Sequence, residues 1–121
     1  MNESQRQYFR AKLLSWRDDI LREVKETLER LQGGNEHHSD LADHANSLAD
    51  RAVDLRAHER QRKLIAKIDA ALQRIEDGTY GYCARTGEPI GLKRLEARPI
   101  ATLSVEAQEW HERQEKIYRN L

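Results

Sequence analysis

The chain has 121 residues and combines a low share of hydrophobic residues, 38%, with a high share of charged residues, 35%, at a formal net charge of zero. This mixture cannot fill a wide core, and it suits long helices that bury one stripe and expose the rest. The neutral net charge argues against bulk attraction to nucleic acid. The absence of an apolar run of about 20 residues argues against a membrane span. A single cysteine excludes an internal disulfide, which fits a reducing cytosol.

A first long helix is predicted over residues 4–32. Apolar side chains recur there at steps of three and four and mark one continuous face: Phe9, Leu13, Trp16, Ile20, Val24, Leu28 and Leu31. Gly33 and Gly34 then end the helix, since glycine takes left-handed positions at low cost.

A second apolar face predicts another helix from Leu41 to the pair Asp77-Gly78. The face breaks at the polar stretch 58–62 and resumes at Ile65. Two long amphipathic helices with a short connection pack antiparallel as a coiled-coil hairpin, so residues 1–78 are expected to form one domain with its tip near 33–46. A plain coiled-coil spacer would have the same pattern.

Charge is unevenly distributed along the second helix. Between Asn35 and Asp54 there are five acids and one base, and between Arg56 and Lys67 there are five bases and one acid. The tip of the hairpin is therefore expected to be acidic and its middle basic.

The tip carries the motif "SDLADHA" at residues 39–45. Asp40 and Asp43 have the spacing of a helix N-cap and a first-turn acid, both of which stabilise a helix start. The same two carboxylates could instead act on a partner. His37, His38 and His44 lie nearby and could suggest a metal site. This is a weaker alternative, since a histidine-rich loop without further ligand context is usually solvated.

Residues 79–121 are predicted to form a second, smaller domain. The segments "TYGYC" and "EPIGL" indicate two short strands around the turn "ARTG", with Gly87 in a left-handed position. Residues 104–121 are again helical, with Ser104 as the N-cap and an apolar face of Ala107, Trp110, Ile117 and Leu121.

Four positions in this domain have the spacing of a zinc ribbon. Cys83, Thr86, Ser104 and Ala107 are separated by two, seventeen and two residues, as in a Cys-x2-Cys … Cys-x2-Cys site that retains one cysteine. We therefore expect a zinc-free finger held by an apolar cluster (Tyr80, Tyr82, Ile90, Leu92, Leu95, Ile100 and Leu103). A redox role for Cys83, with Arg85 stabilising its thiolate, and a partial metal site are the alternatives.

The sequence "YGYCARTGEPIGLKRLEARPIA" resembles the zinc-finger segment of the DksA/TraR family. "RAHERQRKLIAKID" is similar to the family's second helix, and Asp40, Asp43 and Ala45 fit its tip motif Asp-x-x-Asp-x-Ala. The three motifs follow one another in the family's order, and the resemblance extends over residues 35–108. It identifies the chain as a DksA-like protein that lacks the zinc-ligand cysteines.

The resemblance implies a bacterial transcription factor of the stringent response. Such factors insert a coiled-coil tip into the secondary channel of RNA polymerase and destabilise open promoter complexes, without reading DNA sequence. In the family, a site for guanosine tetraphosphate (ppGpp) forms between factor and polymerase. The positions of this chain that match it are Leu64, Lys67 and Arg98, with Arg60 as a further polymerase contact, while Gln108 replaces a basic residue and weakens the expected ppGpp effect.

We therefore expect a mainly α, monomeric, cytoplasmic protein that is not an enzyme and has no cofactor, with RNA polymerase and ppGpp as partners. Two other functions fit the same elements. One is a coiled-coil adaptor without a polymerase role, and the other is a secondary-channel elongation factor whose acidic tip supports transcript cleavage.

Overall fold

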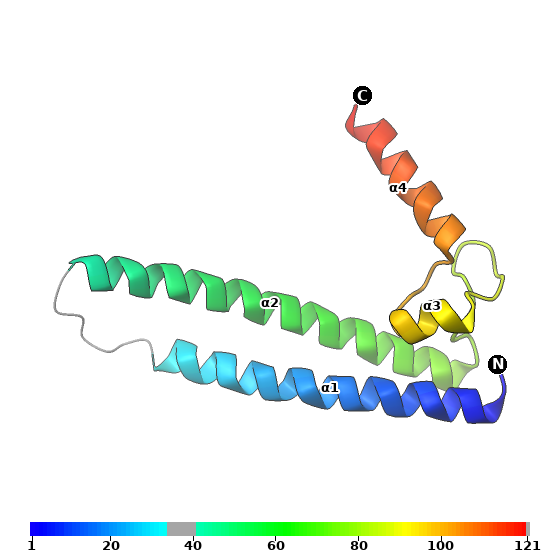
Figure 1. Ribbon diagram of the computed structural model, residues 1–121, viewed down its shortest axis with the longest axis horizontal. Coiled ribbons are helices and arrows are strands. Elements are labelled where there is room, and N and C mark those ends of the chain that lie inside the picture. Colours follow the sequence, from blue (N-terminus) through cyan, green and yellow to red (C-terminus); the bar gives the residue numbers. More distant parts are fainter. Residues whose placement is uncertain (34–40, 121) are drawn as a thin grey trace. The chain divides into compact units, whose positions relative to one another are not determined.

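The computed structural model describes the backbone of residues 1–33 and 41–120, and the side chains of the same residues except 41–46. The described chain is mainly helical, as predicted, and its four helices are α1 (Glu3–Gln32), α2 (Leu41–Asp77), α3 (Leu92–Ala97) and α4 (Val105–Arg119). Figure 1 shows their order along the chain. None of the described helices has an apolar stretch long enough to cross a membrane.

Two compact units make up the chain, and each contains part of both long helices. The hairpin unit is Leu14–Asp69, and the finger unit combines Met1–Leu13 with Ala70–Leu121. The sequence analysis divided the chain into domains at residue 78, and this division stays a prediction.

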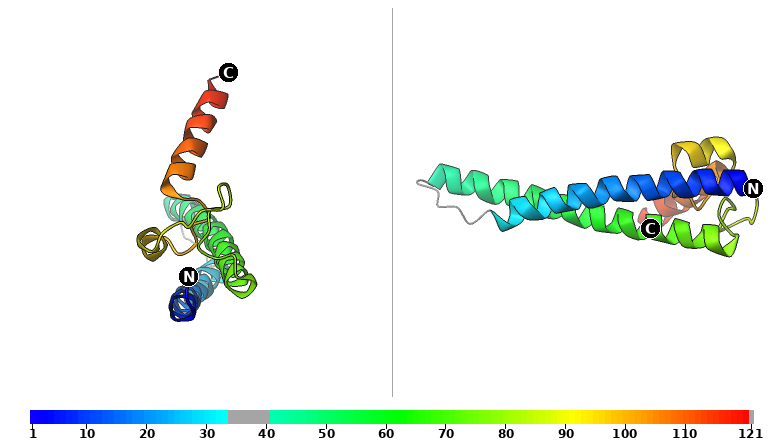
Figure 2. Two further views of the ribbon diagram at one scale, coloured as in Figure 1. Left: turned by 90° about the vertical axis from the view of Figure 1, so that its right-hand side faces the viewer. Right: turned by 90° about the horizontal axis from the view of Figure 1, so that it is seen from below.

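In the hairpin unit, α1 and α2 run antiparallel and side by side (Figures 1 and 2). Arg17, in the middle of the first helix, donates to Asp69 at 2.8 Å, and Arg30, near its end, donates to Asp54 at 3.2 Å. The guanidinium of Arg51 also donates to the carbonyl of Leu31 at 2.8 Å. These contacts confirm the predicted antiparallel hairpin within this unit.

The buried stripe of α1 differs from the predicted one at one position. Thr27 is 1% exposed, whereas Leu28, which the periodicity placed in the core, is 37% exposed. The buried positions Leu13, Ile20 and Thr27 follow a strict seven-residue repeat, which is the spacing that keeps a seam facing a partner helix. Burial of the threonine is tolerated because its hydroxyl donates to the carbonyl of Glu23 at 2.9 Å.

The finger unit contains most of the buried side chains. Phe9 of α1 and Tyr80 have ring centroids 5.8 Å apart, and both are almost fully buried. Around them lie residues from α1, α2, α3, α4 and the intervening segments: Leu13, Ala71, Ile75, Cys83, Ile90, Leu95, Ala101 and Ala107. Tyr82 and Leu92, which the sequence analysis placed in this cluster, are exposed.

The helix α2 ends as the sequence predicts. Gly78 has a φ of 80°, a left-handed conformation that glycine adopts without strain. The amides of Thr79 and Tyr80 then both donate to the carbonyl of Arg74, at 2.9 and 3.1 Å. These bonds satisfy a helix-end carbonyl and direct the chain into the finger.

The two predicted strands of the finger are wrong. Among the described residues this segment has a single antiparallel bridge, between Tyr82 and Pro89. Pro89 has no N–H to extend a ladder, and the chain leaves the bridge at Gly91 to start α3, a short helix that the sequence analysis missed. The predicted turn is confirmed, because Gly87 has a φ of 76° and donates to the carbonyl of Cys83 at 2.9 Å.

The helix α4 begins where the sequence predicts. The hydroxyl of Ser104 accepts a hydrogen bond from the amide of Ala107 at 3.2 Å, so Ser104 is the N-cap. Of the predicted apolar face, Ala107 is buried, Trp110 and Ile117 are exposed, and Leu121 lies outside the described residues.

Candidate functional site

The predicted tip residues fall largely outside the described part of the structure. Asp40 lies outside the described residues, as do His37 and His38. Asp43 and Ala45 belong to the first turns of α2, but their side chains are not among those described. Their roles at the tip stay predictions.

A shallow groove of about 360 Å³ runs along one face of α2 in the hairpin unit. Arg60, Leu64 and Lys67, three of the predicted interface residues, all line it, because steps of three and four bring them to the same side of the helix. The remaining lining residues, which the sequence analysis did not assign to the site, are Arg56, Glu59 and Lys63. Their helical spacing to Arg60 was the available signal.

One carboxylate partly neutralises this groove. Glu59 accepts two hydrogen bonds from Arg62, at 2.8 and 3.2 Å, and lies 4.0 Å from the ammonium of Lys63. The hydrogen bond from Arg62 is the main cause that lowers the pKa of Glu59, so the acid is ionised at neutral pH. Arg56, Arg60 and Lys67 are exposed and have no carboxylate partner among the described side chains. The groove thus presents three available cations to an anion.

Arg98, the fourth predicted interface residue, belongs to the finger unit. It is the C-cap of α3, its backbone amide donates to the carbonyl of Arg94 at 2.7 Å, and its side chain is exposed. Gln108, the position where a basic residue was expected, lies in the first turn of α4 and donates to Glu112 at 3.1 Å. It offers an amide to an anion where the expected side chain would offer a positive charge.

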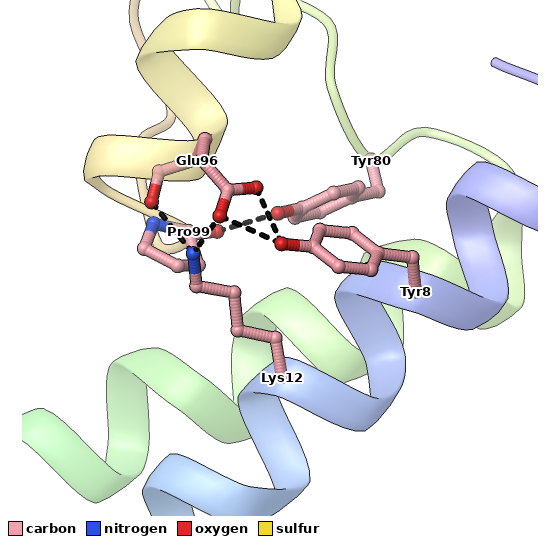
Figure 3. Close-up of polar contacts among 5 residues, drawn as sticks. All are labelled: Tyr8, Lys12, Tyr80, Glu96 and Pro99. Carbon is pink, nitrogen blue, oxygen red and sulfur yellow. Dashed lines mark hydrogen bonds and ion pairs between the residues drawn. The ribbon is translucent and has the colours of Figure 1, made fainter.

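A polar clamp joins α1 to α3 in the finger unit (Figure 3). Glu96 accepts hydrogen bonds from the hydroxyl of Tyr8, at 2.6 and 2.8 Å to its two oxygens, and from the ammonium of Lys12 at 2.7 Å. The same ammonium donates to the Glu96 carbonyl at 2.8 Å. The hydrogen bond from Lys12, followed by that from Tyr8, lowers the pKa of Glu96.

A second contact fixes the chain after α3 (Figure 3). The buried hydroxyl of Tyr80 donates to the carbonyl of Pro99 at 2.8 Å. Burial raises the pKa of Tyr80 to about 12, so the phenol keeps its proton. Sequence reasoning missed the clamp and this bond, since nothing local in the sequence links Tyr8 or Lys12 to a residue more than 80 positions away.

The four positions with zinc-ribbon spacing do not fit a zinc ion. Cys83 can ligate zinc, but Thr86 is exposed, the Ser104 hydroxyl caps α4, and Ala107 has no ligand atom. A structural zinc site needs four ligands, commonly cysteine or histidine. The described side chains include no group of three or more His, Cys, Asp or Glu residues that could hold a metal.

The Cys83 thiol is buried, with 2% exposure, in the turn before Gly87. Burial raises its pKa, but hydrogen bonds from the Thr86 hydroxyl and from the amides of Ser104, Thr86 and Arg85 outweigh burial and lower the pKa to about 6. The guanidinium of Arg85, which the sequence analysis placed beside the thiolate, stacks over the ring of Trp110 at 3.2 Å from its centroid.

Comparisons with known proteins place these features in a family. The description "DnaK suppressor protein DksA, N-terminal domain" matches residues 5–75, and "Prokaryotic dksA/traR C4-type zinc finger" matches residues 78–113. The RNA polymerase-binding transcription factor DksA of Caulobacter vibrioides is 62% identical over 120 residues, which cover 99% of this chain and 84% of that protein.

More distant relatives give the same result. The protein of the same name from Escherichia coli K12 is 39% identical over 116 residues, which cover 96% of this chain and 77% of that protein. The solved structure of transcription factor DksA2 from Pseudomonas aeruginosa superimposes with a TM-score of 0.87 at 43% identity and covers 95% of this chain and 88% of that one. The chain therefore belongs to the DksA/TraR family, with the zinc-finger segment present and three of its four ligand positions replaced.

Proposed function

We propose that this protein is a transcription regulator that binds RNA polymerase directly. The observation that carries the proposal is the 62% identity, over 99% of this chain, to a protein named RNA polymerase-binding transcription factor DksA. At this identity and coverage, the surface that a relative uses is expected to persist. The proposed regulator has no enzymatic activity of its own, is a cytoplasmic monomer, and reads no DNA sequence.

The mechanism we propose is insertion of the hairpin tip into the polymerase secondary channel, where Asp40 and Asp43 destabilise open promoter complexes. Two described contacts near the tip support it. The guanidinium of Arg51 holds the last turn of α1 through the Leu31 carbonyl, and Arg30 pairs with Asp54. They tie the last turn of α1 to residues 51–54 of α2 and would hold the two helices together below the tip.

We further propose that the basic groove and Arg98 take part in a ppGpp site completed by polymerase. Two diphosphates require several cations, and a guanidinium can bind phosphate oxygens in pairs. The groove residues Arg60, Leu64 and Lys67 share one face of α2, and the charges of Arg60 and Lys67 have no carboxylate partner among the described side chains. Gln108 supplies no charge, so the ppGpp effect is expected to be weaker than with a lysine or arginine there.

Independence from zinc is part of the proposal. The segment around Cys83 is held by backbone hydrogen bonds. The Cys83 amide donates to the Glu88 carbonyl at 2.7 Å, and the Ala84 amide donates to the Thr102 carbonyl at 2.8 Å. Metal analysis of the purified protein should find less than about 0.1 zinc per chain. Addition of EDTA should leave its melting temperature unchanged. One zinc per chain, or unfolding by the chelator, would contradict this part of the proposal.

The experiment that tests the function is transcription in vitro from a promoter with a short-lived open complex, with and without ppGpp. The wild-type protein should inhibit, and the double variant Asp40→Asn/Asp43→Asn should lose inhibition while still binding polymerase. The matched control is Asp18→Asn/Asp50→Asn, which makes the same charge change at two exposed acids of the hairpin unit.

The outcomes separate the competing functions. Inhibition that survives in Asp40→Asn/Asp43→Asn would rule out the tip mechanism. Failure of the wild-type protein to bind polymerase would favour a coiled-coil adaptor, and accelerated cleavage of transcripts in backtracked complexes would favour the elongation-factor function.

A further inference from the structure

The backbone around Arg98 is fixed at both of its polar groups, although its side chain is exposed. The Arg98 amide donates to the Arg94 carbonyl at 2.7 Å, and its own carbonyl accepts from Ala101 at 3.0 Å. The guanidinium itself has no hydrogen bond or ion pair with another side chain described in the structure. Arg98 thus has no side-chain partner among the described residues, and its main chain is held by two backbone hydrogen bonds.

The residues on either side of Arg98 are anchored to other elements of the finger unit (Figure 3). Two positions before it, Glu96 is held by Tyr8 and Lys12 of α1. One position after it, the Pro99 carbonyl accepts the buried hydroxyl of Tyr80. In addition, Arg94 donates to the Leu103 carbonyl at 2.7 Å and ties α3 to the segment that precedes α4.

An anchored backbone changes how an arginine binds an anion. A guanidinium on a mobile segment must be ordered when the ligand binds, whereas one on a fixed segment loses only its own side-chain freedom. The described side-chain contacts that hold the end of α3 are those of Glu96, Tyr80 and Arg94.

We propose that Glu96 and Tyr80 are positioning residues for Arg98, and that the clamp of Tyr8, Lys12 and Glu96 sets how well Arg98 responds to ppGpp. This inference rests on the proposed ppGpp function. It deepens that function by assigning the orientation of Arg98 to contacts from α1 and from the start of the finger.

The sign of one substitution distinguishes positioning from simple electrostatics. Glu96→Ala removes a negative charge two residues from Arg98, so electrostatics alone would tighten binding of the anionic ppGpp. Loss of positioning predicts the opposite. We expect the ppGpp concentration for half-maximal effect in the transcription assay to rise about three- to tenfold, as for loss of a few partly exposed charged hydrogen bonds.

Inhibition measured without ppGpp distinguishes loss of positioning from a general structural defect. A general defect would lower this inhibition, whereas loss of positioning would not. The inhibition should stay within about twofold of wild type for Glu96→Ala, since the hairpin contacts are untouched. The matched control is Glu76→Ala, which removes another exposed glutamate that faces α1, 4.0 Å from Arg10, and should leave the ppGpp response unchanged. Tyr8→Phe, which alters no charge, should shift the response in the same direction by about twofold.

One further variant, Arg98→Ala, and the wild-type protein separate failure of this inference from failure of the proposed function. If Arg98→Ala loses the ppGpp response while Glu96→Ala and Tyr8→Phe keep the wild-type curve, the clamp does not position Arg98 and only this inference falls. If the wild-type protein does not respond to ppGpp, both proposals fall. Equal loss of inhibition with and without ppGpp in Glu96→Ala would also overturn the inference, and faster hydrogen exchange at the Arg98 amide should accompany the expected result.

Discussion

The hairpin unit and the finger unit are stabilised in different ways. In the hairpin unit, the fully buried side chains of the described residues are few, and one of them is the polar Thr27. In the finger unit, ten buried apolar side chains from every helix gather around Phe9 and Tyr80. Several large apolar side chains of the hairpin unit are exposed, among them Leu48, Val53 and Leu55.

This difference separates the surface that we propose meets RNA polymerase from the unit that contains most of the buried side chains. A two-helix pair buries one stripe only, so its remaining faces are available for charge, as in the groove of α2. The finger unit, which is small and lacks zinc ligands, depends on packing and on a few long-range hydrogen bonds. Substitutions should therefore affect stability strongly in the finger unit and weakly in the hairpin unit.

The largest expected effect is that of Leu95→Ala in the finger unit. Leu95 is 1% exposed, and truncation of a buried leucine lowers the free energy of unfolding by about 2–5 kcal/mol. The matched variant in the hairpin unit is Val53→Ala, at a residue that is 54% exposed, and it should cost less than about 1 kcal/mol. Urea denaturation followed by circular dichroism measures both, and similar losses would contradict the comparison.

The next effect is that of Tyr80→Phe, which tests a single buried hydrogen bond. The substitution keeps the ring beside Phe9 but leaves the Pro99 carbonyl without its donor, and an unsatisfied buried acceptor costs about 1–3 kcal/mol. Tyr118→Phe, at an exposed tyrosine of α4, is the control and should have no measurable effect. A neutral result for Tyr80→Phe would mean that water replaces the lost donor.

A gain in stability is expected in the hairpin unit from Thr27→Val combined with Gln61→Leu. The Gln61 amide donates to the Thr27 hydroxyl at a long 3.4 Å, and the other amide atom, Oε1, is buried without a partner among the described residues. Replacing both polar groups by apolar ones of similar size should add about 1 kcal/mol. Thr27→Val alone should cost up to about 1 kcal/mol, because it removes the acceptor of Gln61 at 3.4 Å and of Arg30 at 3.2 Å. A clear loss in the double variant would show that this polar contact stabilises the helix pair.

The sequence predicts the helices well because their signals are local. Apolar periodicity identifies α1 and α2, Gly78 ends α2, and Ser104 starts α4, each through a contact within a few residues. The prediction of buried positions fails at Thr27. This polar residue interrupts the apolar pattern at a position that the seven-residue repeat buries.

The finger shows what local signals cannot provide. Strand propensity in "TYGYC" and "EPIGL" is overridden by the Tyr82–Pro89 bridge and the turn to α3, because no neighbouring strand is in place to pair with them. In the candidate site, Arg60, Leu64 and Lys67 on α2 were predicted from the family resemblance, and their spacing of three and four residues explains why they line one groove. The clamp on Glu96 could not be predicted, since its partners in α1 are joined to it only by the fold.

The smallest expected effect concerns the pH dependence of the clamp. The hydrogen bond from Lys12 is the largest cause of the lowered pKa of Glu96, so the carboxylate is stabilised in the folded chain relative to the unfolded one, where its pKa is about 4.3. Stability from such a group is fully present above that value and is lost as the pH falls through the lower folded pKa. At about pH 6–7 the wild-type protein should therefore melt at a higher temperature than Glu96→Gln. This gap in melting temperature should close below about pH 4.

The clamp is exposed, so this gap should be smaller than the shift caused by Thr27→Val/Gln61→Leu. Glu88→Gln, at an exposed acid of the same unit whose side chain has no partner among the described residues, should show no gap at any pH. A gap for Glu96→Gln that widens in acid would mean that the protonated form of Glu96 is the one the fold prefers. The hydrogen bonds from Tyr8 and Lys12 would then not order the end of α3 at neutral pH, and the special stability of the finger unit would rest on its apolar core alone.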